Sequence, residues 1–254
     1  MRFASLGSGS RGNAMVVEAG ATRVLVDCGF GPRILAQRLA RLGLAPADLD
    51  AILVTHEHSD HVGGIGGSAR LGCGVFMTHG TFGAVGQGTV AGIRVELIDS
   101  HAAFAVGDLE ILPFPVPHDA REPVQFVFTD GQRRLGLLTD AGHVTAHVVD
   151  MFAASDAVVI ECNHDADMLA HGNYPRSLKQ RISGRFGHLD NSAAAALLAT
   201  IDGSRLQHVV AAHLSEQNNT PQLARAALAG ALGCAPEWVG VATQGEGFGW
   251  RDLL

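Results

Sequence analysis

The chain has 254 residues, of which 47% are hydrophobic and 17% charged, and its formal net charge is −7. This composition excludes a disordered chain and argues against a long nonspecific nucleic-acid surface, while a local basic groove stays compatible with it. No uncharged stretch approaches the length that spans a bilayer, and the chain enters an apolar strand without a signal-peptide core. We therefore expect one domain, residues 1–254, located in the cytoplasm.

The first predicted elements are two short strands, residues 2–6 and 14–18, joined by a glycine-rich loop. The loop contains Ser8 and Ser10 together with three glycines, an arginine and an asparagine. Its backbone N–H groups and hydroxyls can approach an anion. A flexible hairpin would have the same composition, so the loop alone does not separate the two interpretations.

The most informative stretch is residues 55–61, Thr-His-Glu-His-Ser-Asp-His, directly after a predicted buried strand. Alternate side chains of an extended segment point the same way, so His56 and His58 can share one metal ion. The turn that follows then brings Asp60 and His61 to a second ion. Imidazole and carboxylate are common ligands of transition metals in proteins. A polar loop with incidental histidines is the alternative, and the spacing argues against it.

A carboxylate upstream of this stretch can support it. Asp27 ends a predicted strand, residues 23–27, and an acid in that place can orient a metal-bound histidine from behind. The alternative is an aspartate that only forms a turn before Cys28 and Gly29.

Downstream, short strands alternate with helices, and several strands end in His or Asp. Strands are predicted at residues 75–77, 94–98, 104–106, 109–116, 125–129, 134–138, 157–161 and 208–212, and helices at 31–42, 62–71, 144–153, 191–199 and 221–232. Asn191 is the expected N-cap of its helix. The pattern indicates an α/β sandwich with an active site along one sheet edge. His118, Asp140 and His213 each follow such a strand.

These residues resemble the H-x-H-x-D-H motif and the later ligands of the metallo-β-lactamase superfamily. The resemblance implies an αββα sandwich, with two mixed β-sheets flanked by helices, and a site for two divalent ions. Zinc is the expected metal, and the carboxylates also allow manganese. The implied ligands are His56, His58 and His118 for one ion, Asp60, His61 and His213 for the other, and Asp140 as the bridge. Taken singly, His118 or His213 would more often be a hydrogen-bonded core residue, but the complete set reverses that expectation.

A narrower resemblance runs nearly the whole length of the chain. It is carried by residues 8–13 (SGSRGN), 161–165 (ECNHD), 174–182 (YPRSLKQRI), 187–191 (GHLDN) and 213–221 (HLSEQNNTP). These segments are similar to the YycJ (WalJ) branch of the superfamily, whose members are regarded as DNA-processing 5′ exonucleases, some linked to mismatch repair. The resemblance therefore implies a 5′ exodeoxyribonuclease. Asp190 departs from the branch, where a serine is expected before the asparagine.

The implied reaction is phosphodiester hydrolysis by a hydroxide that two metal ions activate, with Asp60 among the catalytic residues. The leaving 3′ oxygen also needs a proton or a charge partner. His164, in the loop after the strand at 157–161, is the predicted donor; a histidine that only caps the next helix is the alternative. A small-molecule hydrolase of the same fold, acting on a cyclic phosphodiester, thioester or lactone, is the second function to consider.

DNA is the expected partner, through a local basic segment. Arg176, Lys179, Arg181 and Arg185 carry four positive charges with no acid between them. They form either a ridge that follows phosphates or a solvated helix face. The predicted substrate-binding residues are Ser8, Ser10, Asn163, Arg176, Lys179 and His188.

Overall fold

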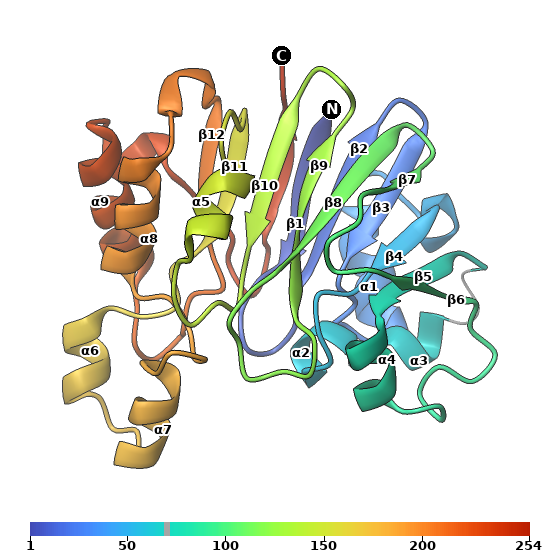
Figure 1. Ribbon diagram of the computed structural model, residues 1–254, viewed down its shortest axis with the longest axis horizontal. Coiled ribbons are helices and arrows are strands. Elements are labelled where there is room, and N and C mark those ends of the chain that lie inside the picture. The colour runs from blue at the N-terminus through green and yellow to red at the C-terminus, as the bar shows by residue number, and fades with distance from the viewer. Residues whose placement is uncertain (69–71) are drawn as a thin grey trace.

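The computed structural model describes residues 1–68 and 72–254. They form two seven-stranded mixed β-sheets packed face to face, with helices on the outer side of each sheet (Figure 1). The predicted αββα sandwich is confirmed. Within the described residues, no helix has the length and apolar character needed to cross a membrane.

The first sheet has the strand order β14-β1-β2-β3-β4-β5-β6. Its strands are β1 (Arg2–Gly7), β2 (Ala14–Ala19), β3 (Thr22–Val26), β4 (Ala51–Leu53), β5 (Gly74–Thr78), β6 (Val95–Ile98) and β14 (Phe248–Asp252). The pairs from β14 to β3 are antiparallel, and those from β3 to β6 are parallel. The sequence pattern did not predict β14, which pairs with β1 from the opposite end of the chain.

The second sheet has the order β13-β12-β11-β10-β9-β8-β7. Its strands are β7 (Phe104–Val106), β8 (Leu109–Pro115), β9 (Val124–Thr129), β10 (Arg134–Leu138), β11 (Ala157–Glu161), β12 (His208–Ala212) and β13 (Gly240–Val241). Strands β10 to β13 run parallel. The parallel run places the carboxyl ends of β10, β11 and β12 at one edge of the sheet, where the predicted site residues Asp140, Asn163, His164 and His213 follow them.

Three apolar layers hold the sandwich together, because both faces of each sheet are covered. Val24 and Val26 point into the core between the sheets, while Leu25 points to the helices outside. In the second sheet Phe126 and Phe128 join the central core, and Val127 joins the outer one. Strands buried on both faces carry near-continuous apolar runs, as these do.

The helices divide between the two outer faces and one end of the molecule. They are α1 (Pro32–Ala40), α2 (Ser59–Val62), α3 (Ile65–Ser68), α4 (His79–Val85), α5 (Ala146–Met151), α6 (Ala166–His171), α7 (Arg176–Ile182), α8 (Asn191–Thr200) and α9 (Pro221–Leu232), with short 3-10 turns at Pro46–Asp48, Gly203–Arg205 and Pro236–Trp238. In Figure 1, α8 and α9 lie outside the second sheet, and α2 and α7 lie at the end opposite the chain termini.

Two predicted helix features are wrong. The helix expected at residues 62–71 is replaced by α2 and α3, and residues 69–71 lie outside the described part. Between these helices, Gly64 lies against the backbone, since an added Cβ would come 2.0 Å from the carbonyl oxygen of Phe30. The N-cap of α8 is Asp190 and not Asn191: its carboxylate accepts hydrogen bonds from the N–H groups of Ser192 and Ala193 at 2.7 and 2.9 Å.

Replacing Asp190 tests this cap. Asp190→Ala should lower the free energy of unfolding by about 1 kcal/mol, because two N–H groups at the start of α8 lose their acceptor. Asp190→Ser keeps an acceptor oxygen and should stay within a few tenths of a kcal/mol of the wild type. Urea unfolding of the metal-loaded proteins measures both. Equal stability of the alanine variant and the wild type would show that the cap contributes nothing.

Candidate metal centre

Three strands, β3, β10 and β12, are followed at one edge of the sandwich by a non-glycine residue with a positive φ angle. Asp27 follows β3, Asp140 lies two residues beyond β10 and His213 follows β12, and their φ angles are 59°, 55° and 54°. Among the described residues, Ala154 is the one other non-glycine with a positive φ. A side chain in this region costs on the order of 1 kcal/mol or more and persists where surrounding contacts enforce it. Contacts around Asp27, Asp140 and His213 must therefore hold these three residues in place.

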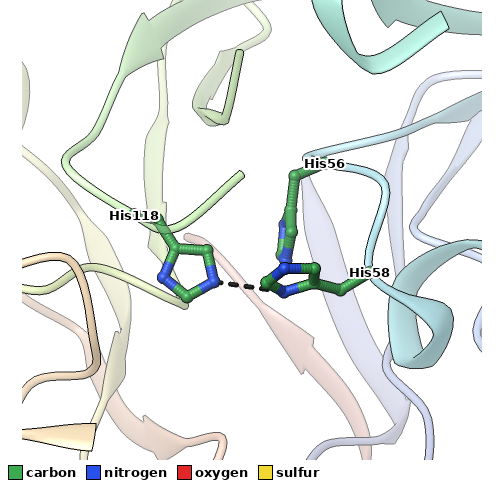
Figure 2. Close-up of side chains that lie close together, drawn as sticks. All are labelled: His56, His58 and His118. Atoms are coloured by element: carbon green, nitrogen blue, oxygen red, sulfur yellow. Dashed lines mark hydrogen bonds between the residues drawn. The ribbon is translucent and has the colours of Figure 1, made fainter. Parts of the chain in front are cut away.

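The first predicted ligand group is assembled. His56, His58 and His118 each offer a ring nitrogen, and these nitrogens all lie within 4.8 Å of one another. Figure 2 shows the three rings converging from the segment after β4 and the loop after β8. Nε2 of His118 lies 3.3 Å from Nδ1 of His58.

Hydrogen bonds on the far side of the His58 and His118 rings indicate that the two facing nitrogens carry lone pairs. Nδ1 of His118 donates to the carbonyl oxygen of Gly187 at 2.9 Å, and Nε2 of His58 donates to that of Asp119 at 3.2 Å. A neutral imidazole has a single N–H, so two neutral rings would point lone pairs at each other. A cation between them removes that repulsion. Nε2 of His56, also in this group, is buried without a hydrogen-bond partner.

The second predicted group is also assembled. Oδ2 of Asp60 lies 3.4 Å from Nε2 of both His61 and His213. Asp140 reaches both groups: its Oδ2 is 3.1 Å from Nε2 of His61, and its Oδ1 is 4.0 Å from Nε2 of His118. Asp140 therefore lies where a bridging ligand would be needed.

Two buried carboxylates hold the ligand histidines from behind. Oδ2 of Asp27 accepts from Nδ1 of His61 at 2.7 Å, which is the contact that the sequence predicted for this acid. Oε1 of Glu161 lies 3.2 Å from Nδ1 of His213 and accepts from Nδ1 of His188 at 2.8 Å. The sequence analysis did not single out Glu161. The signal was available, because Glu161 is an acid at the end of a buried strand, and Asp27 was singled out for a similar position.

Burial and charge act in opposite directions on these groups. Burial holds the pKa of His56 well below its usual value, which keeps the imidazole in the neutral form that binds metals. Burial also opposes charge on His213, but Asp140, Asp60 and Glu161 raise its pKa to about 10. Despite its own burial, Glu161 has a pKa lowered to about 2 by His188 and His213. A metal ion must displace the proton of His213, so metal affinity rises with pH.

The donor set fits divalent metal ions. It combines imidazole nitrogens with carboxylate oxygens, which suits zinc and also manganese. The facing nitrogens of His58 and His118 would repel each other as neutral rings, and Nε2 of His56 is buried without a hydrogen-bond partner, so both arrangements are unfavourable without a cation. The first ion would be held by His56, His58 and His118, the second by Asp60, His61 and His213, with Asp140 shared.

The predicted substrate-binding residues lie in three different settings. Ser8 is buried and its hydroxyl accepts from the N–H of His213 at 2.9 Å. Ser10, Asn163 and His188 line one pocket beside the metal centre. Arg176 and Lys179 lie on α7, and Lys179 donates to the carbonyl oxygen of Ala170 at 2.7 Å. Substrate contact by these residues stays a prediction.

The predicted proton donor, His164, lies deeper than expected. It is 2% exposed, its Nδ1 is buried without a hydrogen-bond partner, and burial lowers its pKa. Within the described chain, it belongs to none of the groups of clustered ligand atoms. His188 is a second candidate, since its Nδ1 lies 3.4 Å from Oδ1 of Asp140 and its ring lines the pocket. The role of His164 stays a prediction.

Comparison with known proteins identifies the family. Residues 22–213 match the model of the beta-lactamase superfamily domain. The chain is 35% identical over 245 residues to exodeoxyribonuclease WalJ of Streptococcus pneumoniae, which covers 94% of this chain and 91% of the relative. This chain belongs to the YycJ/WalJ branch of the metallo-β-lactamase superfamily.

Two further comparisons agree with this membership. Exodeoxyribonuclease YycJ of Bacillus anthracis is 36% identical over 228 residues, covering 89% of this chain and 86% of the relative. Among solved structures, the metallo-β-lactamase fold protein YhfI of Bacillus subtilis superposes with a TM-score of 0.74 and 17% identity, over 98% of both chains. The second match supports the superfamily fold alone. The family predicted from the sequence is confirmed.

The variant Asp140→Ala tests whether Asp140 bridges the two metal ions. If Asp140 contacts both ions, its loss should weaken both sites, and the purified variant should hold fewer than one ion per chain, against about two in the wild type. Elemental analysis after dialysis measures the content. Asp150→Ala, which removes an exposed carboxylate on α5, is the matched control. Two ions retained in Asp140→Ala would contradict the bridging role.

Proposed function

We propose that this protein is a metal-dependent 5′ exodeoxyribonuclease that uses two divalent ions, zinc or manganese. The observation that carries the proposal is the buried cluster around Asp140, in a chain whose relatives over almost its full length are named exodeoxyribonucleases. Bound at these positions, two ions would activate a water molecule and neutralise charge on the phosphate. We further propose that the protein acts in DNA repair in the cytoplasm.

In this proposal, Asp60 orients the attacking water. Its side chain is 18% exposed, the largest opening among the carboxylates of the cluster. Its side-chain contacts with described residues all use Oδ2, including a hydrogen bond from Nδ2 of Asn13 at 3.1 Å. Oδ1 is therefore left for a hydrogen bond from water, which would fix the direction of attack.

In this proposal, His188 serves the leaving oxygen. Its Nδ1 donates to Glu161, so Nε2 is the nitrogen left for a substrate. Burial disfavours its charged form, but Glu161 and Asp140 raise its pKa, which favours the protonated imidazole. Nε2 then gives its proton to the 3′ oxygen as the bond from phosphorus to that oxygen breaks. His164 is the competing candidate for this step.

The basic helix α7 supports a polyanionic substrate. It lies at the same end of the sandwich as α2, which follows the first ligands along the chain (Figure 1). Arg181 of α7 lines the pocket that also contains His188. Positive charge beside the cluster would draw the DNA backbone toward the candidate ligands despite the net charge of the whole chain.

Digestion of labelled DNA tests the function. The metal-reconstituted full chain should release mononucleotides from the 5′ end of single- or double-stranded DNA, and chelation should abolish the reaction. Oligonucleotides labelled at the 5′ or the 3′ end distinguish the direction of digestion. Bis(p-nitrophenyl) phosphate and a thioester are compared in parallel. Hydrolysis of the thioester with intact DNA would instead support the small-molecule hydrolase.

Variants of the two histidines separate their roles. His188→Ala should keep both metals and its fold, yet lose roughly a hundredfold or more in turnover on DNA, the usual scale of general acid catalysis. The loss should shrink with bis(p-nitrophenyl) phosphate, because its leaving group is stable as an anion.

His164→Ala is the matched variant in this comparison. If it shows the substrate-dependent loss and His188→Ala does not, the proton donor is His164. An equal loss on both substrates would assign the tested histidine to phosphate binding or loop structure. Metal content and circular dichroism of both variants exclude indirect effects.

A further inference from the structure

A pocket of about 190 Å³ opens beside the candidate metal centre. Helix α7, the loops on either side of it and the loops after β1, β8, β11 and β12 form its walls. The polar and aromatic side chains that line it are Ser10, Asp119, Asn163, Tyr174, Arg181, His188 and Ser215, and the Asp119 carboxylate is paired with Arg181. Hydroxyls, an amide, a guanidinium and an aromatic ring together suit a phosphorylated sugar with an attached base.

Arg181 is held in this pocket by one edge of its guanidinium. Its Nε donates to Oδ2 of Asp119 at 2.6 Å, and its side chain is 60% exposed. Within the described chain, neither Nη atom of Arg181 donates a hydrogen bond. The other carboxylate oxygen of Asp119 lies 3.4 Å from Nε2 of His118. Asp119 thus fixes the guanidinium relative to the first ligand group and leaves the Nη donors for a phosphate.

The position of His188 indicates which part of the substrate the pocket would hold. In the proposed reaction, a water oxygen bonds to phosphorus, the bond from phosphorus to the 3′ oxygen breaks, and His188 gives that oxygen its proton. The leaving oxygen belongs to the nucleotide on the 5′ side of the reacting phosphate. Because His188 lines the pocket, that nucleotide would lie in the pocket.

We propose that this pocket binds the 5′-terminal nucleotide of the strand, with Arg181 recognising its terminal phosphate and Tyr174 stacking on its base. This inference rests on the proposed nuclease function and adds the identity of the recognised group. A strand with a 5′ phosphate is then preferred over the same strand with a 5′ hydroxyl. A general basic ridge along α7 would create no such preference, because it would contact internal phosphates equally.

Binding of matched oligonucleotides tests the proposal without requiring turnover. Two single strands, labelled at the 3′ end and carrying a phosphorothioate first linkage that slows cleavage, differ only in a 5′ phosphate or a 5′ hydroxyl. Fluorescence anisotropy with the metal-loaded full chain gives both dissociation constants. The wild type should bind the phosphorylated strand roughly tenfold or more tightly, as expected for a charge-assisted arginine contact.

Arg181→Ala should abolish this preference, whereas Arg176→Ala should keep it. Both variants remove one positive charge from an exposed position on α7, but Arg176 does not line the pocket. No preference in the wild type, or an equal effect of the two variants, would overturn the proposal. A preference that depends on Arg181 in a protein that cleaves no DNA would support the pocket and contradict the nuclease function. Cleavage of DNA without a preference for the 5′ phosphate would support the nuclease function and contradict the proposed role of the pocket.

Discussion

The buried carboxylate of Asp140 is the feature on which the rest of the centre depends. At 2% exposure it lies among imidazoles from both predicted ligand groups, and their charge holds its pKa well below the usual value. A carboxylate so far from water is unfavourable without opposite charge close by. Cations bound at this edge would therefore stabilise the folded chain, which would couple metal binding to folding.

The sandwich brings the ligands of both sheets to one edge. His56 and His61 follow β4 of the first sheet, while Asp140 and His213 follow β10 and β12 of the second. The central apolar layer fixes the distance between the sheets, so it also fixes the distance between these groups. Left-handed backbone at Asp27, Asp140 and His213 is tolerated because each side chain is tied into the same cluster.

Two shared carboxylates connect the candidate ligands to the pocket beside them. Glu161 contacts His213 on one side and His188 on the other, so the same acid orients a candidate ligand and a candidate proton donor. Asp119 has the corresponding place between His118 and Arg181. The pocket and the ligand cluster are therefore connected through these two carboxylates.

The sequence by itself determined the features that are local. The ligand motif lies within six residues, and strands β10, β11 and β12 and helix α9 have the predicted bounds, because apolar periodicity and capping act over short distances. Tertiary structure decided the pairing of β14 with β1, the contacts of Glu161 and the Asp119–Arg181 ion pair. Each of these contacts joins segments that lie far apart in the chain. Local sequence patterns do not indicate which distant segments will pack together.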